Sequence, residues 1–195
     1  MSFCFKYNSP IVSSNIKSNN YNLKKYIGKN VKSVDFVNQH SVKSNKLYFT
    51  NMFQRNNSPR INSIIMAISD LISNPDNLDY YFEGREISLI TNKDYEKLKR
   101  LDCILRLYDN VPEKETIIKY VPNERYYNYY SDGYERGFQL FHTRDSDGNA
   151  KIYLIDLYHL AIPSKKNNLI KEYAMVMEYK KDIHEVVFSK VNSLV

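Results

Sequence analysis

RGFQLFHTRDSDGNAKIYLIDLYHLAIP, residues 136–163, is the stretch of the sequence that decides the fold. Two apolar runs, 137–143 and 151–162, flank a cluster of turn-forming residues in which Gly148 can adopt a positive φ at little cost. This pattern predicts a β-hairpin. The second run is too continuously apolar for a strand with one wet face, so it predicts a central strand covered on both faces.

Two helices are predicted to cover this sheet. Ser58 and Pro59 form a good helix start, because serine caps the first turn and proline needs no N–H partner there. Isoleucines spaced three and four residues apart then predict a helix at 59–73, and a second apolar stripe after Thr91 predicts one at 93–108. The predicted fold class is α+β, with a mainly antiparallel sheet centred on a hairpin at 137–162 and packed by these two helices.

Weaker patterns predict the shorter elements. β-prone alternation predicts strands at 2–7, 31–37, 46–50, 86–90 and 116–121, and a terminal strand at 183–188. The run 169–181 favours a helix, although its centre would also suit a strand. Residues 122–137 are predicted to form a tyrosine-rich loop.

The net charge of +6 is concentrated near the N-terminus. Residues 1–50 contain eight lysines and one acid, Asp35, whereas the remaining chain has 20 basic and 21 acidic residues. This asymmetry predicts a basic, Asn/Ser-rich arm or subdomain at 1–50 and an α+β globular domain at 51–195. Lysines release counterions from phosphates, so the arm predicts binding to nucleic acid or another polyanion, with a solvated surface as the alternative.

The composition indicates an intracellular protein. The two cysteines are far apart, no apolar run approaches 18 residues, and the first residues do not resemble a secretion signal. We therefore expect a cytoplasmic protein with no membrane partner. Abundant Asn, Lys, Tyr and Ile are typical of AT-rich coding genomes, such as that of a low-GC bacterium or its phage.

No motif in the sequence assigns a reaction. The four histidines lack metal-ligand spacing, and the five glycines form no phosphate-binding loop, so neither a metal nor a cofactor is expected. The tyrosines of 122–137 would stack on bases if exposed, or simply cover apolar surface. The candidate nucleic-acid-binding residues are Lys24, Lys25, Lys29, Lys32, Tyr126, Tyr127, Tyr129, Tyr130, Lys165 and Lys166.

The order of three motifs resembles that of the RelE/ParE superfamily of small bacterial toxins. They are LYFTNMFQR at 47–55, an isoleucine-striped helix ending in ISNP at 72–75, and the hairpin followed by SKK at 164–166. The resemblance implies metal-independent cleavage of ribosome-associated mRNA, in which basic side chains stabilise the transferring phosphate and a Tyr, His or Lys moves the proton. The matching positions are Arg136, Arg144, His159, Lys165 and Lys166.

Two classes of function follow. The first is a protein that binds nucleic acid, RNA rather than DNA, extended to a metal-independent endoribonuclease whose candidate catalytic residues are Arg136, His142, Arg144 and His159. His142 and His159 are interpreted as cross-strand neighbours near the outer ends of the hairpin. The alternative is a phage or mobile-element protein that binds and inhibits a host defence protein without catalysis.

Overall fold

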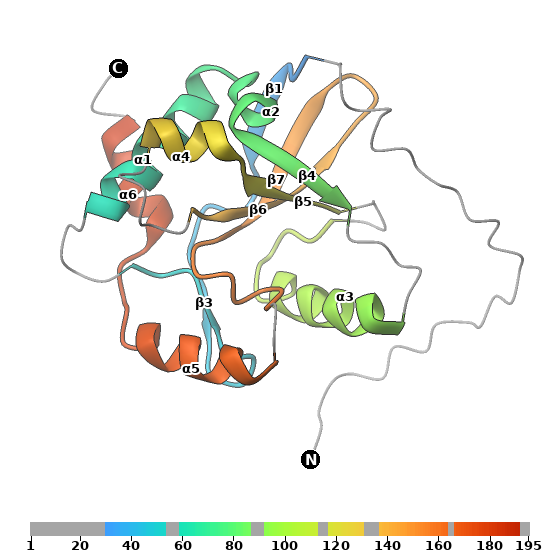
Figure 1. The fold of residues 1–195 in the computed structure, drawn as a ribbon, viewed down its shortest axis with the longest axis vertical. Helices are drawn as coiled ribbons and strands as arrows, with labels where there is room; N and C mark the ends of the chain where they lie inside the picture. Colours follow the sequence, from blue (N-terminus) through green and yellow to red (C-terminus); the bar gives the residue numbers. More distant parts are fainter. Residues whose placement is uncertain are drawn as a thin grey trace, which may run out of the picture.

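A computed structural model describes residues 30–53, 59–86, 92–112, 117–130, 137–163 and 166–191. The described residues form a five-stranded sheet with helices on both faces, and a small two-stranded sheet below it (Figure 1). In spatial order the large sheet comprises β1 (Ser33–Phe36), β7 (Asn149–Asp156), β6 (Gln139–Arg144), β5 (Ile118–Pro122) and β4 (Phe82–Glu86). Only the β1–β7 pair is parallel. The predicted α+β class with a mainly antiparallel sheet is confirmed.

The hairpin is formed by β6 and β7, and its turn is organised by one side chain. The Asp145 carboxylate accepts hydrogen bonds from the backbone N–H groups of Asp147 and Asn149, both at 2.9 Å. Gly148 has a φ of 95°, and a Cβ there would lie 2.7 Å from the Asn30 carbonyl oxygen. The side chains of the turn therefore stabilise the backbone conformation of the turn. The Asn30 carbonyl lies close to Gly148, at the point where β1 begins to run alongside β7.

A β-bulge explains why the second arm of the hairpin is apolar throughout. Phe141 pairs with Leu154 whereas His142 pairs with Ile152, so Tyr153 is an extra residue in β7. An extra residue reverses the alternation of side chains, which places Ile152 in the core on one face and Leu154 in the core on the other. As predicted, β7 is a central strand that is buried on both faces.

The strand β7 ends at Asp156, six residues before the predicted end of the arm. The Asp156 carboxylate is fully buried and accepts hydrogen bonds from the backbone N–H groups of Leu160 (2.9 Å) and Ala161 (2.7 Å). These bonds draw the chain into a turn in which His159 takes a left-handed φ of 59°. The apolar residues after Asp156 are buried by this turn and not by a longer strand.

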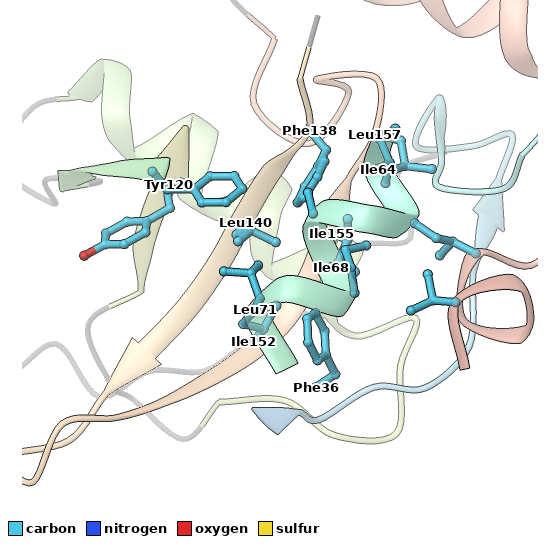
Figure 2. Packing of buried hydrophobic residues seen from close by; sticks show 14 of the residues in the cluster. Phe36, Ile64, Ile68, Leu71, Tyr120, Phe138, Leu140, Ile152, Ile155 and Leu157 are labelled. Carbon is cyan, nitrogen blue, oxygen red and sulfur yellow. The ribbon is translucent and has the colours of Figure 1, made fainter. Parts of the chain in front are cut away.

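One face of the sheet is covered by α1 (Pro59–Ser73), α2 (Asn77–Tyr81), α4 (Glu124–Tyr130) and α6 (Ile183–Val191) (Figure 1). The helix predicted at 59–73 is α1, with the same bounds. Figure 2 shows its packing, in which Ile64, Ile68 and Leu71 lie against the sheet residues Leu140, Ile152 and Ile155. The isoleucine stripe is therefore a core face.

The terminal strand predicted at 183–188 is wrong, because this segment is the helix α6. The Asp182 carboxylate caps it by accepting the N–H of His184 at 2.8 Å, and it also accepts the N–H of Ser41 at 2.7 Å. Ile183, Val186 and Val187 are buried, at the spacing of one helix face. A short run of β-branched residues is compatible with the spacing of a strand and with that of a helix, and the Asp182 cap favours the helix.

The opposite face is covered by α3 (Asn92–Leu105) and α5 (Lys166–Val176), together with β2 (Lys43–Ser44) and β3 (Phe49–Thr50). The helix predicted at 93–108 ends three residues early, because the N–H groups of Leu107 and Tyr108 bond three residues back, as in a tight turn. The helix predicted at 169–181 starts and ends earlier, as α5. No helix among the described residues is long and apolar enough to cross a membrane.

The remaining strand predictions are partly met. The strands predicted at 31–37 and 116–121 correspond to β1 and β5, and 46–50 contains only the two residues of β3. β4 occupies 82–86 instead of 86–90, of which 87–90 lie outside the described residues. The strand predicted at 2–7 and the caps Ser58 and Thr91 also lie outside them.

Gly137, at the entry to β6, is a position where the fold has no space for a side chain. A Cβ there would lie 2.4 Å from Cγ of Pro122 and 3.0 Å from Cε1 of Tyr126. We expect Gly137→Ala to reduce the free energy of unfolding by about 1–3 kcal/mol, because β6 must shift away from β5. Urea denaturation measures this, with exposed Asn128→Ala as the control. A Gly137→Ala protein as stable as the wild type would contradict the packing described here.

Candidate nucleic-acid interface

Arg144, a predicted catalytic residue, is buried in an ion pair. Its Nη2 donates to Oδ2 of Asp79 at 2.9 Å, and the exposed fraction of the side chain is 1% for Arg144 and 33% for Asp79. The Tyr120 hydroxyl donates to the other Asp79 oxygen at 2.8 Å. Burial, and then the Asp79 charge, raise the pKa of Tyr120, so its hydroxyl remains a donor. Arg144 thus anchors α2 to the sheet and has no access to a phosphate.

His142 is also inaccessible. Its ring is fully buried, stands edge-on to the Tyr120 ring at a centroid distance of 4.3 Å, and bonds the Thr143 carbonyl through Nδ1 at 3.2 Å. Burial lowers the pKa of His142 to about 4, which keeps the ring neutral at pH 7. A buried neutral imidazole cannot exchange a proton with bound RNA.

The predicted proximity of His142 and His159 is wrong. His142 pairs with Ile152 across the hairpin, while Nε2 of His159 donates to the carbonyl of Gly137 at 2.7 Å. Gly137 precedes β6 and Arg144 ends it, so His159 and Arg144 are roughly 20 Å apart along the strand. Arg136 and Lys165 lie outside the described residues, and for Lys166 only the backbone, at the start of α5, is described. The described residues therefore do not assemble the expected catalytic group.

Within the tyrosine-rich segment predicted to be a loop, residues 124–130 form the helix α4, and 131–136 lie outside the described residues. The Asn123 side chain caps this helix by accepting the N–H of Tyr126 at 3.2 Å. Tyr126 and Tyr130 face the core four residues apart, Tyr127 is half-buried, and Tyr129 is 63% exposed. Of the four tyrosines predicted to bind bases, only Tyr129 presents most of its ring to solvent. The i, i+4 spacing and the Asn cap were the sequence signals for this helix.

The predicted lysines are mostly outside the described part of the chain. Lys24, Lys25 and Lys29 precede it, and Lys32 is exposed beside the hairpin turn, where its backbone N–H bonds the Gly148 carbonyl at 3.0 Å. The described residues contain 19 basic and 18 acidic side chains, whereas 1–29 contain five lysines and no acid. The excess positive charge is therefore carried mainly by 1–29.

A second group of lysines lies on β2 and its turn, on α5 and at Lys180, whose N–H bonds the Phe53 carbonyl beyond β3; of these lysines only Lys43 and Lys46 belong to the predicted basic arm. We call it the lysine face and define it as Lys43, Lys46, Tyr48, Lys171 and Lys180, all of which are exposed. Lys43 donates to the Met177 carbonyl, which ties β2 to the end of α5. The stretches 43–48 and 171–182 together contain five lysines and three acids, Glu172, Glu178 and Asp182, so basic residues are in excess.

Tyr48 is held in a fixed position on this face. Its N–H donates to the Asn45 carbonyl at 3.2 Å, and its own carbonyl accepts from the Arg100 guanidinium at 3.4 Å. Its ring packs edge-on against Tyr173 of α5 at a centroid distance of 5.8 Å, yet 41% of the residue remains exposed. Tyr48 has a left-handed φ of 47°, which tyrosine rarely adopts. No local sequence pattern indicates this conformation.

The lysine face can neutralise phosphates and offers one aromatic ring for stacking on a base. Within the described ranges, no three His, Cys, Asp or Glu side chains are grouped to hold a metal ion. Comparisons with known proteins found no matching family model, no matching curated protein and no matching solved structure. The resemblance to the RelE/ParE superfamily therefore stays a prediction, neither confirmed nor refuted.

Proposed function

We propose that this protein binds single-stranded nucleic acid, with RNA preferred over DNA, through the lysine face. Tyr48 stacks on a base, the lysines around it pair with phosphates, and the lysines of 1–29 add sequence-independent affinity. Proteins that bind single strands combine these two elements, a basic surface along the backbone and aromatic rings under the bases.

The observation that carries the proposal is the conformation of Tyr48. A left-handed conformation costs an L-residue about 1–2 kcal/mol, which glycine or asparagine in the same turn would largely avoid. Strained residues that expose a functional group occur preferentially at binding sites. Here the strained residue carries an aromatic ring that packs on Tyr173 of α5 and stays partly exposed.

The ribonuclease reaction implied by the RelE/ParE resemblance is not part of this proposal. His142 and Arg144 are buried, and His159 lies at the other end of the hairpin. Binding alone needs none of these three residues. It needs only the exposed side chains of the lysine face.

The test is the substitution Tyr48→Asn. Asparagine accepts a positive φ, so we expect a stability equal to or above that of the wild type. The loss of one stacked base, about 1–3 kcal/mol, should weaken binding roughly 5- to 150-fold. The measurement is fluorescence anisotropy with a labelled oligouridine at low salt, repeated with single-stranded DNA.

The control is Tyr129→Ser, which removes a tyrosine from α4 that is even more exposed than Tyr48 and should leave RNA affinity unchanged. The double substitution Lys43→Gln and Lys46→Gln should also flatten the dependence of log Kd on log salt by up to about 1.4, since each phosphate contact on a single strand contributes about 0.7. Absence of RNA binding at low salt, or wild-type affinity in Tyr48→Asn, would overturn the proposal.

A further inference from the structure

The strand β4 has an outer edge that no other described strand covers. It is the last strand of the five-stranded sheet, and it pairs on its inner side with β5 (Figure 1). Its five residues, Phe82–Glu86, have the sequence FEGRE. An edge strand presents a row of backbone N–H and C=O groups that can pair with another strand. This edge is therefore a candidate interaction surface.

The register with β5 determines which backbone groups of β4 point outward. Phe82 lies opposite Pro122, and the Asn123 N–H donates to the Tyr81 carbonyl at 3.0 Å. Hydrogen-bonded and non-hydrogen-bonded pairs alternate along antiparallel strands. The odd-numbered residues of β4 therefore bond β5, and the backbone groups of its even-numbered residues point toward the outer edge.

The even-numbered residues are Phe82, Gly84 and Glu86. The Phe82 N–H already donates to the Leu78 carbonyl of α2. Among the described residues, none bonds the Phe82 carbonyl or the outward N–H and C=O groups of Gly84 and Glu86. Glycine inside a strand often marks a place where another backbone approaches closely. The outer edge thus offers donors and acceptors on both sides of a central glycine.

The sequence of β4 is complementary to itself in the antiparallel direction. When Gly84 of one copy lies opposite Gly84 of another, Glu83 of each copy lies opposite position 85, an arginine, of the other. Opposite charges at directly opposed positions stabilise a strand pair. Positions 83 and 85 form non-hydrogen-bonded pairs in this register, and in such pairs the side chains are closest. Glu83 is exposed.

The pairing of β4 with β5 gives a second argument for the same register. Arg85 lies directly opposite Lys119, and like charges at such positions destabilise a strand pair. In the self-paired arrangement, Glu83 of the second copy lies on the other side of position 85 and on the same sheet face. The other edge strand, β1, contains one charged residue, Asp35, so its sequence offers no such pairing.

We propose that two copies of this protein pair through the outer edges of β4, antiparallel and about a two-fold axis at Gly84. Two hydrogen bonds join the Gly84 residues, and each Glu86 N–H donates to the Phe82 carbonyl of the other copy. The interface is isologous, and it joins the two sheets into one continuous sheet. A five-residue edge covers less area than a standard interface, so the dimer is a weak one that forms at micromolar concentrations.

The two-fold axis is perpendicular to the sheet, so each face of one sheet continues into the same face of the other. The helix α5 of both copies then lies on the same side of the dimer. One RNA strand could reach both lysine faces, which would raise its affinity through the second attachment. This consequence rests on the proposed function, whereas the dimer itself does not.

The test is sedimentation velocity of the full chain over a series of concentrations. We expect a reversible monomer–dimer equilibrium in the wild type. Glu83→Arg places like charges at both 83/85 pairs, and so does Arg85→Glu, so each should weaken dimerisation about 10-fold or more. An equimolar mixture of the two variants should dimerise again, because the charges of one complement those of the other. Glu178→Arg, which makes the same charge change at an exposed position beyond α5, should dimerise like the wild type.

Amide hydrogen exchange gives a second readout that needs no substitution. Exchange at Gly84 should slow as the concentration of the wild type is raised, whereas exchange at Arg85, whose N–H faces β5, should not change. A wild type that stays monomeric at every concentration would overturn the proposal, and so would equal dimerisation of both charge variants or a mixture of them that remains monomeric. A monomer that binds RNA would refute the dimer alone and leave the proposed function standing.

Discussion

Asp79→Ala is expected to destabilise the protein by about 3–5 kcal/mol, because it leaves a buried guanidinium without a counter-charge. The Arg144 side chain is 1% exposed and its Nη2 lies 2.9 Å from Asp79. The substitution also removes the acceptor of the Tyr120 hydroxyl. Urea denaturation monitored by circular dichroism measures the change.

The double substitution Asp79→Ala and Arg144→Met is the matched control. It removes both charges, and an apolar side chain of similar length then replaces the buried guanidinium, so we expect it to be more stable than Asp79→Ala alone. This order separates an anchoring role from a catalytic one, since a catalytic Arg144 would give stable but inactive variants. If Asp79→Ala unfolds within 1 kcal/mol of the wild type, Arg144 is not held by this pair.

The second large effect is a loss of stability in mild acid. Burial lowers the pKa of both His142 and His184 to about 4, whereas an unfolded histidine titrates near 6.5. Between pH 6.5 and about pH 4, the two histidines are protonated in the unfolded chain but stay neutral in the folded protein. The free energy of unfolding therefore decreases as the pH is lowered through this range. Between pH 7.5 and pH 5 each ring should remove about 2 kcal/mol from the free energy of unfolding.

Urea unfolding at pH 7.5, 6.5, 6.0, 5.5 and 5.0 tests this expectation, because most carboxylates remain ionised over that range. His142→Leu keeps an apolar ring-sized group beside Tyr120 and should remove about half of the pH dependence. A substitution at exposed Asn128 should leave the profile unchanged. A stability that is flat from pH 7.5 to pH 5 would show that the two rings take up protons as readily in the folded protein as in the unfolded chain.

The helix α1 and the hairpin illustrate what local sequence determines. Proline at the first helical position, isoleucines at helical spacing and Asn74-Pro75 at the end all agree, so the bounds 59–73 need no tertiary information. The turn of the hairpin is equally local, because Asp145 bonds residues two and four positions ahead. Where the residues that start an element, the spacing of its apolar residues and the residues that end it all indicate the same structure, the prediction agrees with the structure.

The failed predictions lie where two local patterns compete. The segment 183–188 is rich in β-branched residues and reads as a strand, but Asp182 caps a helix there while also bonding Ser41, far away in the chain. The tyrosine segment has too few apolar residues to show a helical spacing, so its sequence suggests a loop. In the structure, Tyr126 and Tyr130 are buried in the core and form that apolar face. For 183–188 the capping residue also has a partner distant in sequence, whereas α4 has local signals in the i, i+4 tyrosines and the Asn123 cap.

The sequence by itself determined the α+β class, the central hairpin, the helix 59–73 and the concentration of lysines in the first quarter of the chain. Only the tertiary structure decided that Arg144 and His142 are buried, that Tyr153 forms a bulge, and that Tyr48 and Tyr129 are exposed. The reason is that periodicity and capping act over a few residues, whereas the burial of a polar side chain depends on what other elements place above it. For the hairpin residue Arg144, that other element is α2, which supplies its ion-pair partner Asp79 from 65 residues earlier in the chain.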